Sequence, residues 1–169
     1  MNYIIRPIQI EDAKFINEIR RMDGVRENIM GIKSDRISKT EEFIRNLSPN
    51  NHILVAEIQE NNIKKVVGMV GLTVNQSPRV RHSGYVVIFV HKNYQGMGIG
   101  RTLLNQIIDL ADNWLMLVRL ELGVFTDNEV AINLYKSLGF VIEGTKKFAA
   151  IRNGKYVDEY IMGRYSNLH

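Results

Sequence analysis

The pattern of hydrophobic and polar positions predicts a series of β-strands interrupted by amphipathic helices. β-Branched and aromatic residues are concentrated in five runs, at residues 3–6, 53–58, 66–74, 83–90 and 119–124. Such runs are typical of strands. The pair Asn61-Asn62 separates the second run from the third and is typical of a tight hairpin turn. We therefore expect residues 53–90 to form an antiparallel meander of three strands.

Four further segments repeat apolar residues at helical spacing. They lie at about residues 11–21, from Ser38 to about Asn46, after the glycines near residue 98 as far as Leu115, and around residue 131 as far as Gly139. Ser38 with Glu41, and Thr126 with Glu129, have the spacing of helix-starting capping boxes, and Gly139 is placed to end the last helix. We expect about four helices.

The end of the chain predicts a β-hairpin. Residues 140–151 and 156–162 are rich in strand-forming residues, and Asn153-Gly154 between them is the strongest short hairpin signal. Strands therefore come first, one β-α-β crossover lies in the middle, and a hairpin closes the chain. This order predicts a mixed α+β fold with a mostly antiparallel sheet of about seven strands.

The junction between the predicted strand 83–90 and the next helix carries the candidate chemistry. Its sequence is Gln95-Gly96-Met97-Gly98-Ile99-Gly100-Arg101. Alternating glycines let the backbone pass close to a ligand, and the first amides of a helix face whatever binds there. Such a turn holds an anion, most often a phosphate. The spacing excludes a dinucleotide fingerprint and a nucleoside-triphosphate loop, because Arg101 stands where each motif needs another residue.

The pattern that remains, Gln-x-x-Gly-x-Gly, resembles the pyrophosphate-binding turn of the GCN5-related N-acetyltransferases (GNAT), enzymes that use acetyl-coenzyme A. Residues 128–140 match a second signature of the same family, Asn-x-x-Ala-x-x-x-Tyr-x-x-x-Gly-Phe. The two motifs occur in the family's order and at its spacing. Residues 112–115, 121–125, 142–145 and 152–158 are similar to the bacterial subfamily that includes L-amino-acid N-acetyltransferases. This likeness is good between residues 66 and 164 and poor before residue 66.

The resemblance implies a GNAT-like sheet whose fourth and fifth strands splay apart, with acetyl-coenzyme A (acetyl-CoA) as cosubstrate in the gap. The splay would fall between residues 85–90 and 119–124, where Gly123 is consistent with a close approach of backbone and cosubstrate. Main-chain groups of the fourth strand would bind the pantetheine arm, and the glycine turn would bind the pyrophosphate. The implied binding residues are Ile88, Phe89, Val90, Gln95, Gly96, Met97, Gly98, Ile99, Gly100, Arg101, Thr102, Asn128, Ala131 and Tyr135.

The implied reaction is direct attack of an amine on the acetyl thioester, which needs neither a metal nor a covalent intermediate. Tyr135 is the candidate that protonates the departing thiolate, as its counterpart does in the family. A base must also take a proton from the amine. Many relatives place a glutamate on the fourth strand, but residues 85–90 contain no carboxylate. Glu121 and His82 are alternative candidates for this base.

The resemblance to the bacterial subfamily implies a small primary amine as acceptor, most of all an amino acid, whose carboxylate Arg26 could bind. A protein N-terminus, a polyamine and an antibiotic amine are alternative acceptors for an enzyme. A non-catalytic acyl-CoA-binding module is the alternative outside the enzymes. Because relatives are often dimers, a homodimer is a candidate assembly.

Length and composition set the remaining bounds. A chain of 169 residues with 45% hydrophobic residues has enough core for one domain, which we expect to be an N-acetyltransferase domain over residues 1–169. The absence of cysteine excludes disulfides, thiolate metal sites and a cysteine nucleophile. A net charge of +4 suits an anionic ligand, but without a continuous basic run we expect no nucleic-acid partner. No leader or apolar run of about 20 residues is present, so we expect a cytoplasmic protein without membrane contact.

Overall fold

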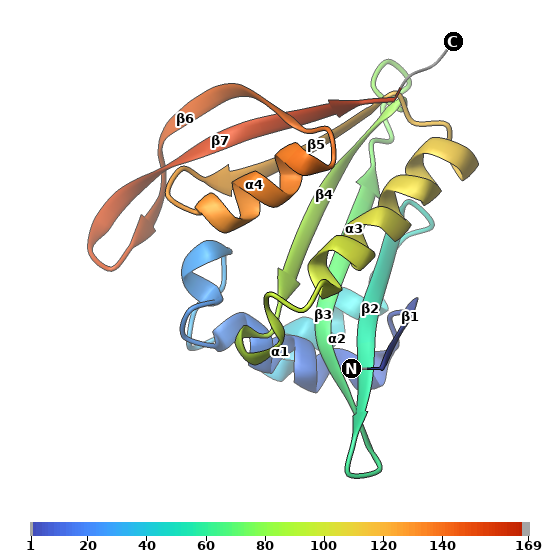
Figure 1. Ribbon diagram of the computed structural model, residues 1–169, viewed down its shortest axis with the longest axis vertical. Coiled ribbons are helices and arrows are strands. Elements are labelled where there is room, and N and C mark those ends of the chain that lie inside the picture. The colour runs from blue at the N-terminus through green and yellow to red at the C-terminus, as the bar shows by residue number, and fades with distance from the viewer. Residues whose placement is uncertain (1, 167–169) are drawn as a thin grey trace. The chain divides into compact units, whose positions relative to one another are not determined.

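A computed structural model describes residues 2–166 of the chain (Figure 1). Its seven strands form one sheet in the order β1-β2-β3-β4-β5-β7-β6. The strands are β1 (Tyr3–Pro7), β2 (Asn51–Glu60), β3 (Ile63–Val74), β4 (Ser83–Val90), β5 (Arg119–Phe125), β6 (Val141–Arg152) and β7 (Lys155–Tyr165). The α-helices within the described residues are α1 (Ala13–Arg21), α2 (Ile37–Arg45), α3 (Ile99–Asp109) and α4 (Glu129–Ser137). The predicted fold class, a mixed sheet of seven strands with four helices, is confirmed.

The predicted meander is confirmed as strands β2, β3 and β4. Asn61 and Asn62 have φ angles of 50° and 63°, the left-handed pair that a two-residue hairpin requires. The amide of His91 donates to the carbonyl of Val67 (2.8 Å), and the amide of Asn75 donates to the carbonyl of Ser83 (3.0 Å). Strands β3 and β4 therefore run in opposite directions. Strand β1 adds to the other side of β2, also antiparallel.

Strands β4 and β5 form the parallel step of the sheet, and their pairing is short. Ser83, Gly84 and Tyr85 pair with Arg119, Leu120 and Glu121, and the recorded ladder ends there. Strand β5, by contrast, pairs with β7 along all of its residues, from Arg119 to Phe125. The splay expected between strands 4 and 5 therefore begins after Tyr85.

The chain divides into two compact units. Unit 1 comprises the residues up to Leu72 together with Ile88–Ile107, and unit 2 comprises Thr73–Val87 together with the residues from Ile108 on.

The core of unit 1 lies between α1 and strands of the sheet. Ile16 and Ile19, two of the apolar positions predicted for the first helix, are each 1% exposed and pack with Ile53, Val55 and Phe89. Helix α3 buries Leu103, Leu104 and Ile107, as its apolar spacing predicts. A Cβ at Gly68 of β3 would lie 3.2 Å from Cδ1 of Leu103, so the glycine lets α3 lie directly on this strand.

Unit 2 is built around the antiparallel strands β5, β7 and β6, with β7 in the middle. The long β6–β7 hairpin is drawn in orange and red in Figure 1. Its turn is Asn153-Gly154, and both residues have positive φ angles (50° and 74°), which confirms the predicted hairpin. Leu120, Leu122 and Val124 alternate along β5 and bury one face of this sheet.

The helix starts differ from the sequence prediction. The capping box of Ser38 and Glu41 is wrong because α2 already begins at Ile37, with Arg36 in the N-cap position. The capping box of Thr126 and Glu129 is also wrong. The amide of Thr126 still donates to the carbonyl of Asp158 on β7 (3.1 Å), so α4 begins later, with Asn128 as its N-cap.

The end of the third helix also differs. Helix α3 is followed by a π-helical turn, Leu110–Trp114, in which the amide of Leu115 donates to the carbonyl of Leu110 (3.0 Å). The buried face continues as far as Ala111, whereas Leu115, the last position predicted for this face, is only partly buried.

The observed cap of α4 can be tested by substitution. Asn128→Ala removes the side-chain oxygen that accepts from the Ala131 amide (3.2 Å), so we expect a loss of about 1 kcal/mol in the free energy of unfolding. For a chain of this size the expected decrease in Tm is about 2–4 °C, measured by thermal unfolding. The matched variant Thr126→Ala removes the oxygen of the capping box that was predicted but is not formed. A larger loss in Thr126→Ala than in Asn128→Ala would contradict the observed helix start.

Candidate active site

The glycine turn at the start of α3 has the conformation that its sequence requires. Gly96 and Gly98 have φ angles of 74° and 83°, in the left-handed region that side chains disfavour. A Cβ at either position would meet no atom within 4 Å, so the backbone here borders open space. The first recorded i→i−4 bond runs from the amide of Thr102 to the carbonyl of Gly98 (3.0 Å), so the amides of Ile99 and Gly100 precede the helical ladder. These features fit an anion cradle.

Two side chains of the predicted binding set hold this turn in place. The Gln95 side chain donates through Nε2 to the carbonyl of Val90 (3.0 Å), which ties the turn to the end of β4. The hydroxyl of Thr102 lies 2.8 Å from the hydroxyl of Tyr3 on β1 and 3.2 Å from the carbonyl of Gly98. Met97 is 51% exposed, whereas Phe89 lies in the core of unit 1. The polar groups of Gln95 and Thr102 thus have structural partners.

A buried histidine that the sequence analysis did not single out begins the loop toward the glycine turn. His91 is 3% exposed, and its Nδ1 accepts from the amide of Asn93 (3.2 Å). Its ring meets the ring of Tyr94 edge to face at 5.1 Å, and the Tyr94 hydroxyl donates to Glu60 (2.7 Å). Burial, followed by the charge of Lys65, lowers the pKa of His91 below its ordinary value, which favours a neutral ring.

Tyr135 lies in unit 2, on the buried side of α4. It is 7% exposed, and its ring lies 6.0 Å from that of Phe140. Burial raises the pKa of its phenol, and the neighbouring phenol of Tyr85 adds to the rise. Tyr135 is therefore held in its protonated form at neutral pH. Asn128 and Ala131 of the same motif meet at the helix start, where Asn128 accepts from the Ala131 amide.

Gly123 leaves room for two side chains of unit 2. A Cβ at this position would lie 2.7 Å from Cδ of Glu159 and 3.0 Å from the hydroxyl oxygen of Tyr85. Neither residue was identified from the sequence, which assigned Gly123 to the approach of a cosubstrate. The structure gives the glycine a different role, because the carboxylate of Glu159 and the phenol of Tyr85 fill the space beside it.

The two bases considered from the sequence also lie in unit 2. Glu121 pairs with Tyr85 in the parallel ladder, and its carboxylate accepts from Arg119 (2.7 Å). The same guanidinium donates to Glu143 (2.7 Å), whose pKa it lowers. His82 is exposed at the start of β4, and its carbonyl accepts from the amide of Val118 (2.8 Å). Glu121 is thus held by a permanently charged partner, whereas the ring of His82 faces solvent.

Arg26, the expected partner of a substrate carboxylate, lies in unit 1 in a short 3₁₀ helix, Arg26–Asn28. Its guanidinium forms ion pairs with Asp23 and with Glu27 (2.9 Å), and it donates to the carbonyl of Arg21 (3.2 Å). Two carboxylates therefore already compensate its charge. A substrate carboxylate would have to displace one of them.

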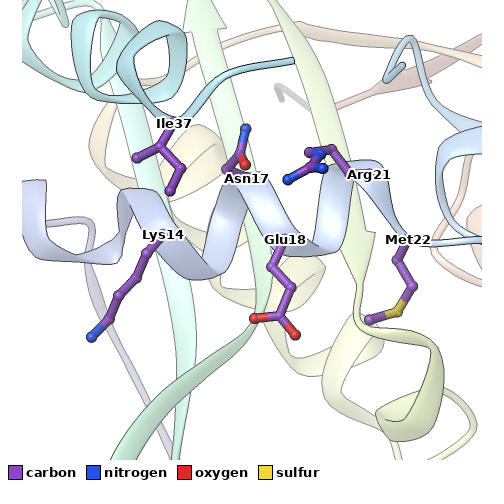
Figure 2. A pocket seen from close by; sticks show the side chains of 6 residues that line it. All are labelled: Lys14, Asn17, Glu18, Arg21, Met22 and Ile37. Carbon is purple, nitrogen blue, oxygen red and sulfur yellow. The ribbon is translucent and has the colours of Figure 1, made fainter. Parts of the chain in front are cut away.

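Unit 1 also contains an open hollow of about 420 Å³ on α1 (Figure 2). Its lining residues are Lys14, Asn17, Glu18, Arg21, Met22 and Ile37. Beside it, the Asn17 amide donates to the carbonyl of the buried residue Asp35 (3.0 Å). Lys39 holds Oδ1 of Asp35 at 2.8 Å and lowers the pKa of this carboxyl, whereas Oδ2 is buried without a hydrogen-bond partner among the described residues. The lining carries both signs of charge.

Within residues 2–166, every helix is too short or too polar to span a lipid bilayer. In the same part of the chain, no three histidine, aspartate or glutamate side chains gather as metal ligands.

Comparison with known proteins identifies the family. Residues 22–140, which include both sequence motifs, match the model of the acetyltransferase (GNAT) family. The chain belongs to this family. It is an N-acetyltransferase, and acetyl-CoA is the donor that the family uses.

Relatives of this acetyltransferase cover nearly the whole chain. The L-amino acid N-acetyltransferase AaaT of Escherichia coli is 36% identical over 95% of this chain and 96% of its own length. The spermidine N(1)-acetyltransferase of Vibrio cholerae is 26% identical over 91% of this chain and 87% of its own length. Among solved structures, a GNAT-family acetyltransferase of Streptococcus pneumoniae is 31% identical, with a TM-score of 0.80 over 98% of this chain and 100% of that chain. The match to AaaT includes the region before residue 66, where the sequence resemblance was judged poor.

The buried His91 makes the stability of the acetyltransferase depend on pH. Its pKa is lowered in the folded state, so its contribution to stability is present above the ordinary pKa of 6.5 and is lost as the pH falls through the folded-state pKa. His91→Asn keeps a side-chain oxygen for the Asn93 amide but cannot titrate. We expect the decrease in Tm between about pH 8 and pH 5.5 to be smaller in this variant than in the unsubstituted protein. His52→Asn, on β2, is the control, and equal decreases in all three proteins would refute the role of His91.

Proposed function

We propose that this enzyme transfers the acetyl group of acetyl-CoA to the α-amino group of an amino acid. The observation that carries this proposal is the similarity to the E. coli L-amino acid N-acetyltransferase, which is 36% identical and extends over 95% of the chain. That range includes α1, α2 and their connection, the part of the chain to which we assign the acceptor. We further propose that residues 1–169 act as one acetyltransferase domain.

The residues of the donor side fit coenzyme A. The backbone of the turn from Gly96 to Gly100 would hold the pyrophosphate, because the chain at Gly96 and Gly98 borders open space. Arg101, exposed in the first turn of α3, would add a positive charge. Main-chain groups of Ile88, Phe89 and Val90 would bind the pantetheine arm. The bond from Gln95 to Val90 supports this assignment, since it joins the two binding segments.

Acetyl-CoA supplies an activated thioester, so the protein has few chemical tasks. The chain must bring the amine and the thioester together, which turns a bimolecular encounter into an effectively unimolecular one. It must also protonate the departing thiolate, and we assign this step to Tyr135. A phenol whose pKa is raised by burial keeps its proton at neutral pH, so it is available to protonate the thiolate as the carbon–sulfur bond breaks.

For the acceptor side we propose that Arg26 binds the amino acid carboxylate by exchanging one of its two acidic partners. The partner most easily displaced is Asp23, whose side chain is 71% exposed, because exposed ion pairs contribute little. A polyamine is the second candidate acceptor. It is favoured by the carboxylates of Glu121 and Glu159 on the face of unit 2 that also carries Tyr85, and by the similarity to a spermidine acetyltransferase over 91% of the chain.

Thiol release from acetyl-CoA tests the proposed function. With a panel of amino acids, polyamines and peptides, we expect release to be fastest with one or more L-amino acids. Tyr135→Phe should lower kcat by about 100-fold, because it removes the proton donor, and should leave the dissociation constant of acetyl-CoA unchanged. Tyr156→Phe, at an exposed position of the β6–β7 hairpin, is the control and should behave as the unsubstituted enzyme. Full turnover in Tyr135→Phe would show that Tyr135 is not the proton donor. Failure of every amine in the panel to cause thiol release would refute the proposed function.

A further inference from the structure

We propose that Glu159 of β7 is the general base of this enzyme, the group that takes a proton from the acceptor ammonium. This inference rests on the proposed function and adds the residue that its chemistry lacks. No carboxylate lies on β4, where many relatives have one, and the two substitutes considered from the sequence are a carboxylate paired with Arg119 and an exposed histidine.

The Glu159 side chain reaches from β7 across β5. In the β5–β7 pairing Glu159 lies opposite Phe125, two residues beyond Gly123 on β5. Its carboxylate lies over Gly123, beside the hydroxyl of Tyr85, because the glycine leaves room for both groups. A carboxylate from β7 thus crosses β5 and approaches a residue of β4.

The carboxylate of Glu159 and the phenol of Tyr85 meet at the end of the β4–β5 ladder. Tyr85 belongs to the last recorded pair of the β4–β5 ladder, so Glu159 approaches β4 where the two strands part. The phenol of Tyr85 interacts both with Glu159, the proposed base, and with Tyr135, the proposed acid. The charge of Glu159 adds to the effect of burial in raising the pKa of Tyr85, and Tyr85 in turn raises the pKa of Tyr135. The proposed base and the proposed acid therefore belong to one cluster within unit 2.

The carboxylate of Glu159 is largely buried and is paired with an exposed lysine. The Glu159 side chain is 13% exposed, and its ion-pair partner is Lys146, whose Nζ lies 3.3 Å from Oε2 and whose side chain is 58% exposed. An exposed lysine at this distance is a weak and exchangeable partner. The other oxygen, Oε1, lies on the side of Gly123. Glu121 differs because its partner Arg119 stays charged at all relevant pH values and holds it at 2.7 Å.

Glu159 takes one proton from the ammonium, directly or through one water, and later releases it to solvent. The freed lone pair of the nitrogen forms the new bond to the acetyl carbon, and the carbon–sulfur bond breaks. Tyr135 gives its proton to the thiolate and regains one, through water, from the nitrogen of the new amide. The net products are the acetylated amine, the free thiol and one proton.

The experiment compares variants in the thiol-release assay with the best amine of the panel. Glu159→Gln is isosteric and gives up the ion pair with the exposed Lys146, so we expect it to fold and to bind acetyl-CoA with unchanged affinity in calorimetry. Its kcat/KM for the amine should fall by about 100-fold or more. Formate should restore part of the activity to Glu159→Ala, because it can occupy the space left by the side chain and accept the proton.

The matched control is Asp158→Asn. This substitution removes one carboxylate from the adjacent position, on the opposite face of β7, where Asp158 pairs with Lys147 at 2.7 Å. It should keep the turnover of the unsubstituted enzyme. Full activity in Glu159→Gln, an equal loss in Asp158→Asn, or a loss in Glu159→Ala that formate does not restore would overturn the role of Glu159. Absence of thiol release by the unsubstituted enzyme would instead refute the proposed function.

Discussion

The short parallel ladder between β4 and β5 is the constraint on which the candidate site depends. The recorded pairs stop at Tyr85 and Glu121, although β4 continues to Val90 and β5 to Phe125. Backbone amides and carbonyls that lose their strand partner need another one, since an unpaired buried group is costly. Strand β7 pairs with β5 along its whole length, whereas the ladder of β4 with β5 ends at Tyr85. An extended ligand that binds like an additional strand meets this need, as the pantetheine arm is proposed to do.

The same ladder explains the chemistry assigned to unit 2. Tyr85 closes the ladder, Gly123 lies two residues beyond its partner Glu121, and the missing Cβ of Gly123 admits the carboxylate of Glu159. A methyl group at residue 123 would displace the carboxylate of Glu159 and crowd the phenol of Tyr85. One backbone choice on β5 thereby determines which polar groups meet beside the last pair of the ladder. Tyr135 is linked to this cluster through its interaction with Tyr85.

Features encoded by neighbouring residues could be predicted from the sequence. The Asn61-Asn62 and Asn153-Gly154 hairpins, the strand Ser83–Val90 and the turn at Gly98 depend on local backbone preferences, and the structure contains them at the predicted positions. The two motifs also sufficed to identify the family. The capping box of Ser38 and Glu41 failed because α2 begins at Ile37. The capping box of Thr126 and Glu129 failed because a tertiary contact decides the start of α4. The Thr126 amide bonds to β7, which extends the strand-like pairing past the end of β5.

Features set by strand register and by distant partners could not be predicted. Glu159 meets Gly123 and Tyr85 only because β7 lies between β5 and β6, an arrangement with no local signal in residues 155–165. The compensation of Arg26 by Asp23 and Glu27 depends on a 3₁₀ turn, and the burial of His91 depends on the packing of unit 1. In each case the residue type is visible in the sequence, but the groups that surround it in the fold are not.

Hydrogen exchange with and without acetyl-CoA measures whether backbone amides at the end of β4 and in the glycine turn bind the donor. We expect acetyl-CoA to slow exchange of the amides in residues 88–90 and 96–100 and to leave the hairpin turn at Asn153-Gly154 unchanged. Unchanged exchange in both of the first two segments, at an acetyl-CoA concentration that saturates turnover, would contradict this binding.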